Sequence, residues 1–145
     1  MFGKALIELA SKPGVYRLLE IGTWYGGGST QAFVQGLQGT NKATCVSNAT
    51  HHCCDAFVTT FEIFGPAHEH ARLYHQDNPV WLIKGTTVGV EDILKESEIP
   101  HKDAHFELYY QRDLKLIKES EPQLAKYCKL LDPDVVLIDG NEYTG

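Results

Sequence analysis

The sequence lacks the features that would place it in a membrane, in a disulfide-bonded scaffold or on a nucleic-acid backbone. It has no apolar run of about 18 residues, so no transmembrane helix and no membrane partner are expected. Its 4 cysteines are too sparse for a disulfide scaffold and favour a reducing compartment, with the cytoplasm as the expected location. Lys and Arg total 13 against 19 Asp and Glu, and the net charge of -6 argues against nucleic acid as a partner.

What is present is the composition of an ordinary globular protein, with 43% hydrophobic and 22% charged residues. The length of 145 residues suits one domain with a single core. Apolar periodicity predicts helices over residues 2–10, 31–38, 54–64, 67–74 and 90–98, and through most of 101–130. Strands are predicted over residues 15–23, 43–47, 80–84 and 134–139. This alternation predicts an α/β fold, a Rossmann-like three-layer sandwich with a mainly parallel sheet.

The most informative segment is the glycine-rich stretch LLEIGTWYGGGST, residues 18–30. A short apolar strand passes here through glycines into a helix that a serine or threonine would cap. Such a turn lets a nucleotide approach the backbone at the helix N-terminus. The glycine spacing is not G-x-G-x-x-G, which disfavours NAD, and Gly28 stands where a Walker A loop has its lysine. What remains is E-x-G-x-x-x-G-G-S, with Glu20 two residues before Gly22.

This pattern resembles motif I of the class I S-adenosylmethionine (SAM) dependent methyltransferases. The resemblance implies SAM as the cofactor and a pocket for its methionine part at this loop. Ser29 would lie near the SAM carboxylate at the helix N-terminus. The loop residues implied in cofactor binding are Glu20, Gly22, Thr23, Gly26, Gly28 and Ser29. A tight strand-to-helix turn without a ligand is the structural alternative.

Two further cofactor contacts follow from the same resemblance. The family places an acid at the end of its second strand, where it accepts hydrogen bonds from the ribose hydroxyls. The strand predicted over residues 43–47 has no such acid, and Asn48 is the expected substitute. After the third predicted strand, the turn K-G-T-T occupies the region where the family commonly contacts the adenine, which implies contacts from Gly85 and Thr86. An ordinary strand-end turn explains these two residues equally well.

The segment VVLIDGNEY, residues 135–143, resembles the I-D-G-x-H-x-Y segment of small-molecule O-methyltransferases related to the catechol type. The resemblance implies that Asp139 is catalytic, orienting the acceptor hydroxyl or helping to deprotonate it. It also makes Asp139 a candidate ligand for Mg²⁺, which would lower the pKa of that hydroxyl. Glu142 replaces the usual histidine, and Tyr143 is retained. A strand-end acid that caps a loop is the structural alternative for Asp139.

These resemblances predict methyl transfer from SAM to a hydroxyl of a small molecule or sugar. The alternative is a non-catalytic nucleotide-binding or interaction module of the same fold in a larger assembly, which Asn48 and Glu142 favour. The family's sheet has more strands than are predicted here, so residues 1–145 are expected to form a single methyltransferase-like domain that is incomplete at its C-terminus. A homo-oligomer or a longer chain would then cover the sheet edge. The long crossover around residues 101–120 is expected to be a cap or a partner surface.

Overall fold

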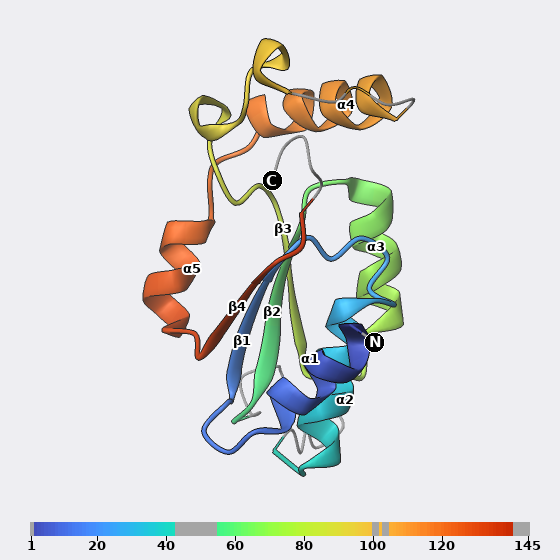
Figure 1. Ribbon diagram of the computed structural model, residues 1–145, viewed down its shortest axis with the longest axis vertical. Helices are drawn as coiled ribbons and strands as arrows, with labels where there is room; N and C mark the ends of the chain where they lie inside the picture. Colours follow the sequence, from blue (N-terminus) through green and yellow to red (C-terminus); the bar gives the residue numbers. More distant parts are fainter. Residues whose placement is uncertain (1, 43–54, 100–101, 103–104, 141–145) are drawn as a thin grey trace.

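The computed structural model describes residues 2–42, 55–99, 102 and 105–140. Within these residues, four strands form one parallel sheet in the order β3-β2-β1-β4. The strands are β1 (Arg17–Ile21), β2 (Phe57–Glu62), β3 (Val80–Lys84) and β4 (Val135–Ile138). The helices are α1 (Phe2–Ser11), α2 (Ser29–Gly39), α3 (Gly65–Tyr74), α4 (Phe106–Lys118) and α5 (Leu124–Leu131). Figure 1 shows α5 on one face of the sheet and α1, α2 and α3 on the other, which confirms the predicted α/β Rossmann-like sandwich.

The core lies on both faces of β1. Leu18 packs with Val58 and with α1 and α2 on one face. Leu19 and Ile21 point to the opposite face, where they join a cluster completed by α5. Because β1 is buried on both faces, its sequence RLLEI shows no alternation of polar and apolar residues.

β2 replaces a helix that the sequence pattern predicted over residues 54–64, and that prediction is wrong. The strand FVTTFE is almost wholly buried, so it shows no alternation, and periodicity cannot distinguish it from a buried helix. Its β-branched and aromatic side chains are nevertheless those that favour strands. The strand predicted over residues 43–47, and Asn48 at its end, lie outside the described residues.

Two other predicted elements differ in detail. Gly65 and Pro66 were expected to end a helix, but they begin α3. Proline is tolerated in the first turn because the N–H groups there have no partner within the helix. The helix predicted over residues 90–98 is two short 3₁₀ turns, η2 (Val90–Asp92) and η3 (Glu96–Glu98). In each turn an acidic side chain accepts a nearby backbone N–H, and such local bonds compete with a continuous helix. The other predicted helices and strands within the described residues are confirmed, with boundaries shifted by a few residues.

Between β3 and α5 the chain makes an excursion that starts and finishes at the end of β3. Thr86 forms a parallel bridge with Pro122, and the backbone N–H of Gln123 donates to the Thr86 carbonyl at 3.0 Å. The excursion carries η2, η3 and α4, and α4 lies beyond the carboxyl ends of the strands, across the top of the sheet in Figure 1. Phe106 and Tyr110 of α4 pack with Ile99 in a small core of their own. None of the helices in the described part of the chain is long and apolar enough to cross a membrane.

Candidate functional site

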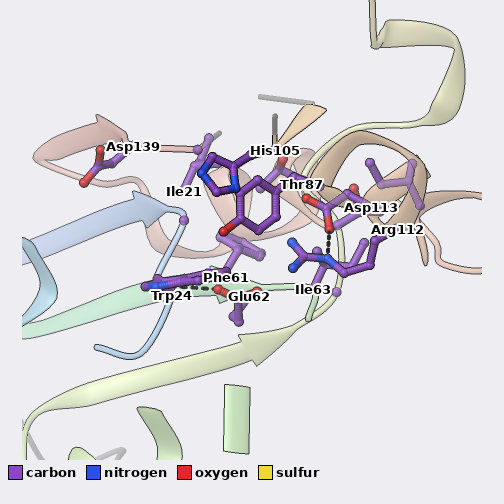
Figure 2. A pocket seen from close by; sticks show the side chains of 16 residues that line it. Ile21, Trp24, Phe61, Glu62, Ile63, Thr87, His105, Arg112, Asp113 and Asp139 are labelled. Atoms are coloured by element: carbon purple, nitrogen blue, oxygen red, sulfur yellow. Dashed lines mark hydrogen bonds and ion pairs between the residues drawn. The ribbon is translucent and has the colours of Figure 1, made fainter. Parts of the chain in front are cut away.

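A cavity of about 450 Å³ lies at the carboxyl ends of β1, β2 and β3, beneath α4 (Figure 2). Ile21, Phe61 and Glu62 contribute the strand-end wall, and Gly85 with the following threonines contributes the turn after β3. Open α/β sheets bind their ligands outside this edge, because strand ends and helix N-termini converge there. The volume falls in the range of pockets that hold small organic ligands.

Glu62 is the acidic residue that ends β2, and the sequence analysis missed it. Its Oε2 accepts the backbone N–H of Trp24 at 2.7 Å, and its Oε1 accepts that of Phe64 at 2.8 Å. Burial raises the pKa of this carboxyl, and the two backbone N–H groups oppose the rise. Each carboxylate oxygen can accept a second hydrogen bond, so Glu62 retains the capacity to bind a donor in the cavity. The resemblance called for an acid at this place, and the mistaken helix over residues 54–64 concealed it.

Trp24 connects the glycine-rich loop to the end of β2. It has a positive φ of 52°, which is rare for a bulky residue and is usually tolerated where surrounding structure enforces it. Its N–H donates to Glu62, and its ring packs against Phe64 and Tyr109 at centroid distances of 6.5 and 6.1 Å. The loop conformation is therefore fixed from both the sheet and α4.

The glycines of the loop divide into two groups. Gly22 has φ of 97°, and a Cβ there would collide with the backbone carbonyl of Asp139. Gly26 has φ of 82°, and a Cβ there would lie 2.8 Å from Nε2 of His75. Packing alone thus requires these two glycines. At Gly27 and Gly28, by contrast, no described atom lies within 4 Å of an added Cβ, so open space adjoins the N-terminus of α2, where anionic groups bind.

Glu20 and Thr23 support the loop from within the core. Oε2 of Glu20 accepts hydrogen bonds from the hydroxyls of Thr30 and Thr60 at 2.5 and 2.7 Å. Burial raises the pKa of the carboxyl, and hydrogen bonds from neighbouring hydroxyls oppose the rise. The Thr23 hydroxyl lies 2.5 Å from that of Thr60 and donates to the carbonyl of Phe61. Both residues hold β1 and β2 together behind the cavity wall.

Asp139 lies at the cavity on the side opposite Arg112 (Figure 2). The Ser29 hydroxyl donates to its Oδ2 at 3.0 Å, so the predicted cofactor loop and the predicted catalytic acid are in direct contact. The described side chains include no group of three or more His, Cys, Asp and Glu that could hold a metal ion. The side chains described around Asp139 therefore do not fit the Mg²⁺ site that the resemblance implied.

The turn after β3 contributes backbone more than side chains. Thr86 is buried, and its hydroxyl donates to the carbonyl of Val88 at 2.8 Å, within the turn itself. Gly85 has φ of 153° and donates its N–H to the Glu62 carbonyl at 3.2 Å. The turn therefore places its backbone beside Glu62, and both predicted residues line the cavity.

The excursion after β3 supplies the remaining wall of the cavity. Tyr109, Arg112, Asp113 and Ile117 of α4, together with His105, line it. Sequence reasoning placed a cap or a partner surface in this region and considered Tyr109 for the lining of an acceptor pocket, with core packing as the favoured alternative, but it did not identify the other side chains. The long separation from the glycine loop in the sequence left no local pattern that could have paired them.

No protein-family model matches the sequence, and no curated protein matches it. Among solved structures, the chain is similar to SAH-bound Podospora anserina methyltransferase PaMTH1, with TM-score 0.45 and 23% identity over 59% of this chain and 32% of that one. It is also similar to a candidate caffeoyl-CoA O-methyltransferase from Staphylococcus aureus, with TM-score 0.38 and 27% identity over 58% of this chain and 32% of that one. In both cases the likeness spans less than a third of the other protein. What this chain binds is therefore inferred from its own residues.

Proposed function

We propose that the cavity binds SAM, with the ribose at Glu62, the adenine against the turn at Gly85, and the methionine carboxylate near the N-terminus of α2. The observation that carries this proposal is the position of Glu62, a buried carboxylate at the end of β2 that is fixed by two backbone N–H groups and lines the cavity. A fixed carboxylate is the natural acceptor for a vicinal diol. The open space at Gly27 and Gly28 supports an anionic group at α2.

The reaction we propose is methyl transfer to a hydroxyl of a small molecule or sugar. SAM, when bound, supplies the methyl group, and the protein's task is chiefly to position the two reactants in a water-poor pocket. The hydrogen bond from Ser29 orients the Asp139 carboxylate at the cavity. In that position Asp139 would accept the hydrogen bond of an acceptor hydroxyl and help to remove its proton.

Calorimetric titration with SAM and S-adenosylhomocysteine (SAH) tests the binding step. Replacing Glu62 with Gln removes the charge, and we expect SAH affinity to fall at least tenfold, because a hydrogen bond to a charged group contributes about 1.5–3 kcal/mol. Glu69→Gln is the matched control: this exposed acid on α3 pairs with Arg72, and its loss should leave SAH affinity unchanged. Absence of SAH binding by the folded wild-type protein would rule out the proposed cofactor.

A second candidate is a non-catalytic module of the same fold in a larger assembly. The observation that favours it is the exposed apolar surface of β4, where Val136 and Ile138 are 50% and 73% exposed. Among the described strands, β4 pairs only with β1, so its other edge is open. Light scattering of the purified chain would detect a homo-oligomer. SAH binding without turnover of SAM on any tested hydroxyl compound would favour this candidate over the enzyme.

A further inference from the structure

α4 belongs to an excursion that leaves and rejoins the fold at the end of β3, yet one of its faces lines the cavity. Arg112 and Asp113 follow Tyr109 by three and four residues, so both lie on the same face of the helix as Tyr109. Figure 2 shows the ion pair between Arg112 and Asp113 on the α4 side of the cavity, with Glu62 below it. The excursion therefore places charged side chains over the acid at the end of β2.

The guanidinium of Arg112 is held by aromatic rings from three separate parts of the chain. It lies 4.3 Å from the ring centroid of Phe64, 5.1 Å from that of Tyr109 and 5.8 Å from that of Trp24. Phe64 follows β2, Trp24 belongs to the glycine-rich loop, and Tyr109 lies one turn before Arg112. A planar guanidinium stacks on such faces in a way that an ammonium group does not reproduce.

Asp113 completes the arrangement by accepting a 2.6 Å hydrogen bond from Nε of Arg112. The Asp113 side chain is only 4% exposed and that of Arg112 is 22% exposed. Both charges act on Glu62 in opposite senses: Arg112 lowers the pKa of the Glu62 carboxyl, and Asp113 raises it. These two effects on the pKa of Glu62 are smaller than those of burial and of the two backbone N–H bonds.

Other titratable groups belong to the same end of the sheet or to the same cavity. Lys84 is the register partner of Glu62 on β3, and His105 and Asp139 line the same cavity. Of the charged residues of the cavity, Arg112 and Asp113 form an ion pair with each other, and their helix enters the site from outside the sheet. The geometry thus places a coupled pair of opposite charges next to the acid proposed to bind the ribose.

We propose that α4 is an integral wall of the nucleoside pocket, with Arg112 and Asp113 as positioning residues whose opposite charges tune the Glu62 carboxylate that would bind a ribose diol. This inference rests on the proposed function, since it assigns α4 to the SAM site. It differs from the expectation that the crossover around residues 101–120 is only a cap or a partner surface. A helix that lines the pocket and shifts the protonation of the ribose-binding acid influences cofactor affinity directly.

The test is calorimetric titration of SAH into the full chain between pH 5 and 8.5, for the wild type, Arg112→Met, Arg112→Lys and Asp113→Asn. Affinity should fall on the acid side as Glu62 takes up a proton. Loss of the Arg112 charge should move the pH midpoint of this fall in affinity upward, whereas loss of the Asp113 charge should move it downward. Arg112→Lys keeps the positive charge, so its midpoint should lie closer to that of the wild type than the midpoint of Arg112→Met does. Lys115→Met, which removes an exposed cation from the same helix, should leave it unchanged.

The outcomes separate the two proposals. Opposite shifts of the midpoint in Arg112→Met and Asp113→Asn support the role of α4, because a purely structural effect would weaken binding equally at every pH. If the wild type binds SAH but both variants keep its midpoint, or shift it in the same direction, the role of α4 is overturned while the SAM site stands. If the folded wild type binds no SAH at any pH, the SAM site itself is overturned.

Discussion

The hydroxyl of Ser29 donates a 3.0 Å hydrogen bond to Oδ2 of Asp139 and so joins the first residue of α2 to the residue that follows β4. The backbone N–H of Asp139 also donates to the carbonyl of Ile21, at the end of β1. The loop proposed to bind SAM and the acid proposed to serve the acceptor are therefore one connected structure.

The first prediction concerns Asp139. Asp139→Asn keeps the shape of the side chain but removes its ability to take up a proton, and we expect turnover to fall by about 100-fold with SAH affinity unchanged. The assay is methyl transfer from labelled SAM to hydroxyl compounds, with binding measured in parallel. Asp134→Asn is the control, because Asp134 accepts the N–H groups of Tyr16 and Arg17 at the opposite end of β4. The Asp134→Asn variant should be less stable than the wild type, and its turnover per folded molecule should be unchanged. Equal turnover in wild type and Asp139→Asn would remove Asp139 from the mechanism.

The second prediction concerns the two kinds of glycine in the loop. Gly22→Ala places a Cβ against the Asp139 carbonyl in a residue with positive φ, and should lower the free energy of unfolding by more than about 2 kcal/mol. Gly27→Ala adds the same methyl group where no described atom lies within 4 Å and should leave stability nearly unchanged. Chemical denaturation measures both. Similar stability of the two variants would show that β4 does not constrain Gly22.

The third prediction concerns His75, which is buried beneath the loop. Its Nε2–H donates to the carbonyl of Gly26 at 2.8 Å, and Asn78 donates to its Nδ1 at 3.2 Å. Burial lowers the pKa of this histidine, so the folded protein binds a proton less readily than the unfolded chain does. Stability should therefore be full above about pH 6.5 and should decline as the pH falls below that value, through the lowered pKa of the folded state.

Replacement of His75 with Gln should reduce this decline, because the group that gains a proton on unfolding is gone. His70→Gln, on the exposed side of α3, is the control and should keep the wild-type dependence. The measurement is the free energy of unfolding as a function of pH between 5 and 8. An unchanged slope in His75→Gln would mean that another group causes the decline.

The fourth prediction concerns Glu20, whose buried carboxyl has a raised pKa. A raised pKa in the folded state means that the folded protein holds the proton more tightly, so the stabilisation is full at about pH 4 and below. It is lost as the pH rises through the pKa of the folded state. Glu20→Gln should make the unfolding free energy less dependent on pH over this window. A wild-type slope in the variant would indicate that the pKa of Glu20 does not differ between the folded and unfolded states.

The sequence sufficed for the fold where elements have a clear period or strong end signals, as in α1, α2, β1 and β3. It failed at β2, because a strand buried on both faces shows no alternation, and only the run of Val58, Thr59, Thr60 and Phe61 favoured a strand. That single error concealed Glu62. Conversely, a local motif singled out Asp139, which does line the cavity, although its chemical role stays a prediction.

Other parts of the site depend on contacts that no local pattern records. The sequence predicts that Gly22 makes room for the turn and for a ligand, and the residue does line the cavity; in the folded chain it also makes room for the backbone of Asp139. The aromatic rings around Arg112 come from three segments distant in the sequence. Such relationships arise from topology, here from the excursion that returns α4 over the sheet, and they become visible only once the strand order is known.

The placement of the chain's 2 tryptophans gives the molecule an internal optical probe. Trp24 lines the cavity and is 45% exposed, whereas Trp81 packs on the α5 face of the sheet against Tyr127 and Phe57. A molecule entering the cavity changes the polarity around one indole and leaves the other in its apolar surroundings. Fluorescence emission can therefore follow occupancy of the site in the unlabelled protein, with Trp81 as a constant background.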